Sequence, residues 1–511
     1  MKRAELSTAQ ARWEALDKCR SAVLNIKREC AELTIPSLLP RERVEDRRDL
    51  TNISTPYQNL GTRGVNNVAN KMSLALFPPR NVFFRLVPKP DIYKELSPEE
   101  KGEATEILRD IEEQIAASIE RRGVRSVEVF KHLCVTGDCL VYIPLSEAEE
   151  GMKMSLYPID TYVVNRDRQG ELLEIVVKEV KALGTIEEDI KIEAGLSLDE
   201  ADMLENCNIF TYIYLREGKY HKFIEINGVK ISNTEEEWDK EELPYIPLTW
   251  SLITGNSYGT SLVESILGDL RTYEAFTQMS IEIAAIMSKV LFVVNPGIND
   301  PKTLADAKSG DFVTGSAEEI AALQVNKMND AQMLLHKSDK LERSLAETFM
   351  LNSSIRRDAE RVTAEEIRLM ADELETAFGG VYSVIAEELQ TRVVKMFMRK
   401  VIAKAGFDAS LIDMLEPAII TGMDALGRSR EFMSLQTFLQ TAFALPGGGN
   451  YIDIGEVVSR IATFTGVKSE GILRDKEEVM QEIQQQQQAM AMQEAANTKV
   501  ADNLTKPTTG G

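Results

Sequence analysis

The stretch Lys289-Val290-Leu291-Phe292-Val293-Val294-Asn295-Pro296-Gly297 marks a change of structure near the middle of the chain. Before it, apolar residues recur at helical spacing over residues 258–290, which predicts a helix roughly 45 Å long at 1.5 Å per residue. Within it, Pro and Gly break the helix after a short β-prone run, and Asp311-Phe312-Val313 supplies another. A second helical pattern covers 329–349. Two long helices that flank a small β unit predict a stalk with a tip.

A short basic stretch follows the second of these helices. Residues 351–362 show no helical stripe and carry Arg356, Arg357 and Arg361 beside two acidic residues, so we expect a loop. A basic loop between two long helices is suited to contact phosphate groups. The alternatives are an ordinary surface loop and a set of salt bridges between subunits.

The next segment predicts the longest helix of the chain. Thr363-Ala364-Glu365-Glu366 is a capping box, in which Thr363 caps the helix and Glu366 completes the motif. An apolar stripe then continues toward Gly406. Gly379-Gly380 lies in the middle of this stripe, where lost side-chain packing and added backbone freedom predict a kink.

The first 250 residues combine helix and sheet signals, so the expected fold class is α+β and predominantly helical. Apolar residues from Trp13 to Leu33 alternate at spacings of three and four, a helical seam in which Cys19 and Cys30 are expected to pack. A capping box at Ser97-Pro98-Glu99-Glu100 predicts another helix. Asn227-Gly228 has the residue types of a type I′ hairpin turn. Runs rich in β-prone residues lie at 140–143, 173–180 and 209–215.

Composition limits the kind of partner this chain can bind. The 511 residues are 43% hydrophobic and 27% charged, enough for two to four domains with buried cores. Lys and Arg number 59 and Asp and Glu number 81, a formal net charge of −22, which argues against tight wrapping by nucleic acid. Any DNA contact must be local. Met1–Arg80 nevertheless holds fourteen basic and nine acidic residues, which a solvated helix face explains better than binding of an acidic partner.

Targeting and membrane signals are weak. Five cysteines are few and odd in number, and no apolar segment typical of a secretion signal follows Met1-Lys2-Arg3, so we expect a reduced, cytoplasmic site of synthesis. The uncharged stretches 243–263 and 432–452 contain Pro, Gly, Gln, Ser and Thr. Neither is expected to cross a membrane.

The motifs of common catalytic sites are missing from the sequence. No P-loop occurs, and none of the three histidines lies near a nucleophile elbow, so we expect no catalytic residues and no cofactor. His132, Cys134 and Cys139 are close in sequence, but no second ligand pair accompanies them, so core packing is favoured over a metal site. The acidic run Glu235-Glu236-Glu237 is expected to be a solvated loop rather than a magnesium site.

Short motifs in a constant order make this sequence similar to a known family. It resembles the portal proteins, or head-to-tail connectors, of short-tailed, podovirus-type bacteriophages over about residues 55–400. The similarity fades after Gly406. The motifs are Asn59-Leu60-Gly61-Thr62-Arg63-Gly64-Val65-Asn66-Asn67, Leu76-Phe77-Pro78-Pro79, Val135-Thr136-Gly137-Asp138, Val163-Val164-Asn165-Arg166-Asp167, Ser257-Tyr258-Gly259, Gly268-Asp269-Leu270, Lys289 to Pro296, Gly310-Asp311-Phe312-Val313 and Glu360 to Ile367.

The resemblance implies a portal fold and a domain order. The domain boundaries are expected from the positions of the matching motifs. The expected domains are a wing at 1–257, a stem helix at 258–290, a clip at 291–328, a second stem helix at 329–349, a channel loop at 350–362, a long kinked wing helix at 363–405, a helical crown at 406–500 and a disordered tail at 501–511.

The resemblance also implies a role and partners. It implies a ring of about twelve subunits at one capsid vertex of the virion, through which double-stranded DNA enters during packaging and leaves at ejection. Implied partners are the terminase large subunit, a tail adaptor, and the major capsid and scaffolding proteins. No catalysis by this chain is implied.

Charge suggests how DNA would pass such a channel. Twelve chains, each carrying −22, would make the channel largely repulsive to phosphate, so DNA would not adhere as it slides. Sparse rings of Arg356, Arg357 and Arg361, with Lys337, Lys340 and Arg343, would steady the duplex without reading its sequence.

Two other classes of protein remain open at this point. A soluble helical scaffold or adaptor that forms no channel would have similar length, acidity and long helices, and closed ring symmetry separates the two. A nucleic-acid-processing enzyme would need clustered metal-binding carboxylates, and the sequence has no such cluster.

Overall fold

The computed structural model describes residues 8–41, 43–44, 47–48, 53–78, 82–88, 98–122, 126–144, 154–197, 199, 202–287, 291–294, 302, 306, 320–323, 328–351, 364–404, 414–419, 435–443, 452 and 457. The chain divides into two compact units. The first contains Met1–Ile92 and Leu108–Gly422, and the second contains Tyr93–Ile107 and Met423–Gly511.

The largest sheet in the described part of the first unit has six antiparallel strands. Its strands follow the order β10-β9-β8-β7-β6, and β11 also pairs with β9. Asn227 and Gly228 link β9 to β10 with φ of 50° and 77°, so the predicted hairpin is confirmed. The strands are β6 (Tyr162–Arg166), β7 (Leu172–Ala182), β8 (Asn206–Arg216), β9 (Lys219–Ile226), β10 (Val229–Lys230) and β11 (Glu236–Asp239). Between β7 and β8 lie η3 (Leu183–Thr185) and α6 (Glu188–Glu193).

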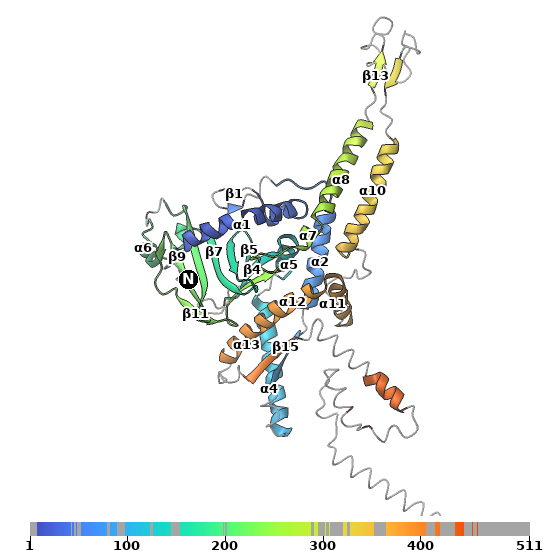
Figure 1. Ribbon diagram of the computed structural model, residues 1–511. Coiled ribbons are helices and arrows are strands. Elements are labelled where there is room, and N and C mark those ends of the chain that lie inside the picture. The colour runs from blue at the N-terminus through green and yellow to red at the C-terminus, as the bar shows by residue number, and fades with distance from the viewer. Residues whose placement is uncertain are drawn as a thin grey trace, which may run out of the picture. The chain divides into compact units, whose positions relative to one another are not determined.

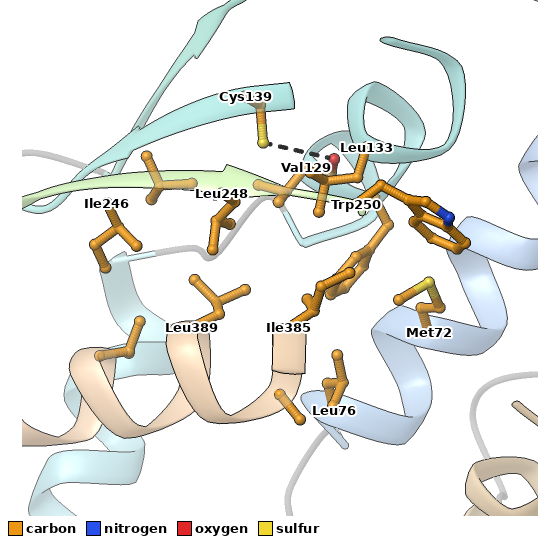
Figure 2. Packing of buried hydrophobic residues seen from close by; sticks show 14 of the residues in the cluster. Met72, Leu76, Val129, Leu133, Cys139, Ile246, Leu248, Trp250, Ile385 and Leu389 are labelled. Carbon is orange, nitrogen blue, oxygen red and sulfur yellow. Dashed lines mark hydrogen bonds between the residues drawn. The ribbon is translucent and has the colours of Figure 1, made fainter. Parts of the chain in front are cut away.

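A second sheet and several helices enclose the main core. The sheet has the order β12-β4-β5, with β4 (Asp138–Tyr142), β5 (Ser155–Pro158) and β12 (Tyr245–Thr249). Figure 2 shows α2 (Leu60–Leu76), α5 (Ser126–Thr136) and the α12 region closing around this sheet. Cys139 is fully buried there, and its thiol lies 3.9 Å from the Val129 carbonyl oxygen. Burial raises the pKa of both Cys134 and Cys139 well above the usual range, so these thiols pack as apolar groups.

Helix α1 (Ala9–Glu32) packs against the large sheet (Figure 1). The Glu225 carboxylate of β9 accepts hydrogen bonds from the Ala9 and Gln10 amides at 2.6 and 3.1 Å, which places negative charge at the helix N-terminus. Cys30 is buried as predicted, but the prediction for Cys19 was wrong, because that thiol is exposed. Trp13 is also buried, but in the middle of the helix the buried face is rotated from the predicted seam toward Arg20, Leu24 and Lys27.

Helix α4 (Pro98–Arg122) is attached to a small two-stranded sheet. Within the first unit, the Glu112 carboxylate accepts from the Leu86 amide at 2.7 Å and pairs with Arg85 at 2.6 Å, both on β3 (Phe84–Pro88). Strand β15 (Leu415–Ile419) pairs with β3, although the sequence predicted helix in this region. Pro417 lacks an amide hydrogen and is tolerated in an edge strand.

Two helices of the first unit lie side by side (Figure 1). The first is α8 (Leu267–Met287), which follows the short helix α7 (Leu262–Ser265). The second, α10, covers Met328–Thr348. Between them in sequence, β13 (Leu291–Val294) pairs antiparallel with β14 (Ile320–Leu323), and most other residues of the expected clip lie outside the described part.

The expected long helix is interrupted twice. α11 (Ala364–Phe378) ends at Gly379, whose φ of 58° suits glycine, so the break falls where the glycine pair predicted a kink. α12 (Gly380–Ala386) then passes into a π turn, η7 (Glu387–Thr391), before α13 (Arg392–Lys404). The π turn had no sequence prediction. Its buried Gln390 donates a hydrogen bond to the Leu76 carbonyl at the end of α2.

The acidic run at 235–237 lies partly on β11 rather than wholly in a loop. Its carboxylates are matched by lysines of neighbouring strands: Glu235 with Lys230, Glu236 with Lys222, and Glu237 with Lys219. The carboxylates of all three pairs are exposed, although the Lys222 side chain is only 10% exposed, so these pairs fit a largely solvated surface and contribute little to stability.

The remaining described segments are short. They include η1 (Pro36–Leu38) and the strand pair β1 (Arg43–Val44) and β2 (Arg47–Arg48). In the second unit the structure describes the first part of α4 and a helical stretch at 435–443. Most of the expected crown and all of the expected tail lie outside the described residues. No helix in the described ranges has the length and apolar character needed to span a membrane.

Candidate functional site

The pair of helices α8 and α10 is joined to the rest of the first unit at two places, and each is built from motifs that stood out in the sequence. The first is the start of α7, just before α8. Ser261 caps α7, because its hydroxyl accepts from the Glu264 amide at 2.9 Å while the Glu264 carboxylate faces the Ser261 amide at 3.4 Å. The helical pattern began at 258 in the sequence, whereas the helix begins at Leu262 because of this cap.

A buried lysine and a buried aspartate hold the loop before this cap. Lys27 of α1 donates to the Gly259 carbonyl oxygen at 2.6 Å and pairs with Glu264. Asp138, at the start of β4, accepts from the Gly259 amide at 2.8 Å. Both polar groups of Gly259 are therefore bonded to charged side chains from distant parts of the chain.

The electrostatics of Asp138 are unusual. Burial raises its pKa from 3.8 to about 7, although Lys27 and the Gly259 amide act in the opposite direction. Its second oxygen, Oδ2, is buried and has no hydrogen-bond partner among the described residues. Near neutral pH this carboxyl is therefore partly protonated.

Two further motifs meet at the same loop. The Tyr258 hydroxyl accepts from the Val164 amide at 3.1 Å, and the Ser257 hydroxyl accepts from the Arg166 amide at 3.2 Å. The Arg166 guanidinium donates to the Pro247 carbonyl oxygen at 3.0 Å. The backbone of β6 is thus bonded to the segment that precedes α7, and Arg166 bonds the same strand to β12.

The second junction is the end of α10, which rests on α2. The Asn67 amide group donates to the carbonyl oxygens of Phe349 and Met350, both at 3.0 Å. Phe349 is fully buried against Gly64, where an added Cβ would lie 2.3 Å from the ring. Residues of the motif that begins at Asn59 therefore contact the end of α10.

Of the six residues expected to contact DNA, three lie in the described part of the chain and three do not. Lys337, Lys340 and Arg343 are exposed on α10. The other three, Arg356, Arg357 and Arg361, lie outside the described residues. The three described cations follow one another at intervals of three residues, so they spread across one side of the helix.

Sequence reasoning did not identify the residues that hold the junctions. Arg20 and Lys27 were part of a basic excess assigned to a solvated face, but both are buried: Arg20 donates to the carbonyl oxygens of Ile159 and Tyr162. That assignment was wrong for these two because both cations bond buried backbone carbonyl groups of distant segments. Asp138 and Asn67 each lie in one of the short motifs that resemble the portal family. Their place in these motifs was the only sign in the sequence that they matter.

Metal chemistry has no support in the described part of the chain. No group of three or more His, Cys, Asp or Glu side chains there is arranged to hold an ion. His132, Cys134 and Cys139 are buried core residues.

Comparison with known proteins gives these junctions a family context. A family model described as bacteriophage head to tail connecting protein matches residues 6–473. The chain belongs to this family. The connector is 36% identical to the portal protein of Enterobacteria phage T3 over 501 residues, which cover 96% of this chain and 91% of that protein. It is 36% identical to the portal protein of Escherichia phage T7 over 498 residues, covering 96% and 92%. The portal protein of Enterobacteria phage SP6 is 32% identical over 503 residues, covering 94% and 92%.

The resemblance inferred from the motifs is thereby confirmed, but its expected extent was too short. The family model matches beyond the 55–400 range on both sides and continues past Gly406 to residue 473. This connector is a structural component of a phage virion at the portal vertex, and not an enzyme. Its mixture of helices and strands agrees with the expected α+β class.

Proposed function

We propose that the connector assembles into a closed ring of about twelve copies around a channel for double-stranded DNA. The observation that carries this proposal is the nearly full-length similarity to the T3 and T7 portal proteins. DNA would enter through the ring during packaging and leave through it at ejection.

Exposed apolar side chains on the stem support an assembly of several copies. Five large apolar side chains on these two helices are 48–60% exposed in the single chain. A monomer rarely exposes such residues along neighbouring helices unless another surface covers them. In a ring, each copy would cover part of the next copy's stem. The five are Met279, Ile281, Ile286, Met333 and Leu335.

Basic residues on the stem support contact with DNA of any sequence. Lys337, Lys340 and Arg343 are exposed cations in a chain whose net charge is −22. Isolated cations in an acidic ring would hold phosphate weakly, so the duplex would be centred without being trapped. We assign the same role to Arg356, Arg357 and Arg361.

Partners follow from the same proposal. The segment 291–328, which contains the β13–β14 pair, would be the clip that receives the terminase large subunit during packaging and the tail adaptor afterwards. The major capsid and scaffolding proteins would surround the ring in the head. The crown would be formed by residues 406–500, with β15 as an exception because it pairs with β3 in the first unit.

Electron microscopy and native mass spectrometry of the purified full chain test the ring. We expect closed particles of about twelve copies with a pore wide enough for a double helix. Ile281→Lys should prevent ring formation, because it puts a charge on the apolar stem surface. Leu204→Lys is the matched control, since Leu204 is 88% exposed but lies away from the stem in the loop before β8. A compact dimer without a pore, or rings in Ile281→Lys, would contradict the proposal.

A further inference from the structure

The end of α10 has a backbone conformation that its sequence does not favour. The Leu351 amide donates to the Ala346 carbonyl at 2.8 Å, and the Met350 amide donates to the Glu347 carbonyl at 2.9 Å. This pair of bonds is the Schellman arrangement, which places a left-handed residue just after the helix. That residue is Met350, with φ of 54°, where glycine is usual. Something outside the helix must therefore hold this turn.

Helix α2 supplies the contacts that hold it. The Asn67 amide bonds to the carbonyl oxygens of Phe349 and Met350, the two residues that form the turn. Lys71 lies one turn further along the same face of α2, and its ammonium is 3.5 Å from the Met350 carbonyl oxygen. The side chains of Phe349 and Met350 are buried, so the turn cannot rotate without opening the core.

Lys71 also contacts α11, which follows residues 352–363 in sequence. Its ammonium forms an ion pair with the Glu373 carboxylate of α11 at 3.0 Å. The lysine side chain is only 6% exposed and the glutamate 30% exposed, so water screens this pair less than a surface pair. Met350 precedes residues 352–363 in sequence and Glu373 follows them. One ammonium thus joins both flanks of that segment.

We propose that Asn67 and Lys71 are positioning residues that fix the two flanks of residues 352–363 to the wing. The functional part of this inference rests on the proposed function, in which Arg356, Arg357 and Arg361 of that segment meet DNA. The left-handed Met350 sets the direction in which the chain leaves the stem. Lys71 bonds both that exit and α11, so both flanks of the segment are held on α2.

Trypsin provides a direct test, because its cleavage sites after Arg356, Arg357 and Arg361 lie within the segment. Full-length connector would be digested briefly under native conditions, and mass spectrometry would measure cleavage at these sites. Lys71→Met and Asn67→Ala should each increase cleavage there on the order of tenfold, since charge-assisted and buried hydrogen bonds limit local opening. Glu373→Gln, at a partly exposed position, should have a smaller effect in the same direction and guards against a folding failure of the buried variants.

Two further variants separate positioning from general stability. Lys27→Met removes a buried lysine that also bonds one carbonyl and one glutamate, but at the other junction, so it should leave cleavage after these arginines unchanged. Combining Lys71→Glu with Glu373→Lys should restore slow cleavage, because the ion pair is rebuilt with its charges exchanged. Unchanged cleavage in both Lys71→Met and Glu373→Gln, or an equal increase in Lys27→Met, would overturn the positioning role.

DNA retention in assembled particles distinguishes this inference from the proposed function. If Lys71→Met raises cleavage and also lowers retention, both are supported. If cleavage rises while retention stays at the level of the unmodified protein, the flanks are held as proposed, and the result counts against DNA contact by the arginines.

Discussion

Replacing Asp138 with Asn should make the stability of the connector less dependent on pH. Asp138 is fully buried, and among the described residues only one of its oxygens has a hydrogen-bond donor, the Gly259 amide. Burial raises the pKa of this carboxyl from 3.8 to about 7 despite the nearby Lys27 ammonium. Asn keeps the shape and the acceptor oxygen but cannot ionise.

The size and direction of the effect follow from the two pKa values. Because the folded chain keeps this proton at pH values where the unfolded chain has lost it, its contribution to stability is fully present below about pH 3.8. That contribution falls as the pH rises and is lost above about pH 7. The full difference corresponds to about 4 kcal/mol at roughly 1.4 kcal/mol per pH unit. Asp138→Asn should therefore gain stability relative to the unmodified chain between pH 5 and pH 8, by roughly 2–3 kcal/mol.

Thermal unfolding of both proteins at pH 5 and pH 8 measures this difference. The midpoint of Asp138→Asn should exceed that of the unmodified protein at pH 8 by several degrees more than at pH 5. Asp239→Asn, at a largely exposed position on β11, is the control and should show no such change. The reasoning would be refuted if Asp138→Asn lost more stability at pH 8 than at pH 5. That result would mean that an ionised Asp138 stabilises the fold through Lys27.

Three other predictions concern packing, DNA and thiol chemistry. Gly64→Ala should lower the free energy of unfolding by about 2 kcal/mol or more, because its new Cβ would overlap the Phe349 ring. The change would be measured as a lower thermal midpoint. Gly268→Ala is the control and should not lower the midpoint, because its new Cβ would meet no atom within 4 Å. Replacing Arg356 and Arg357 together by Ala should reduce packaging yield or DNA retention in assembled particles, and normal values of both would argue against DNA contact. Cys19 should be alkylated much faster than the four buried cysteines when peptides are analysed by mass spectrometry.

Features set by neighbouring residues could be read from the sequence. The Asn227-Gly228 turn and the break at Gly379 were predicted because each depends on the backbone preferences of one or two residues. In α4 the spacing of Leu108, Ile111, Ile115 and Ile119 also indicates the inner face of the helix; the three isoleucines are buried and Leu108 is partly buried. Helical spacing decides such a face whenever the residues on it are all apolar.

The direction in which a helix packs was harder to predict. The seam of α1 predicted that Cys19 and Ile26 would be buried, but Ile26 is 41% exposed and Cys19 is exposed as well. Arg20 and Lys27 lie inside instead. Their cost of burial is offset by carbonyl groups and a carboxylate that belong to segments more than a hundred residues away.

The sequence alone therefore determined the order of helix, short β strands and helix over residues 258–349, the hairpin, the glycine break and, through its motifs, the family. These follow from local backbone preferences, from periodicity and from residue identity. Only the tertiary structure decided that Asp138 and Lys27 meet at Gly259 and that Lys71 joins Met350 to Glu373. The physical reason is that these buried polar groups are stable only because distant segments supply their hydrogen-bond partners. The spacing of residues along the chain does not show which distant residues will be in contact.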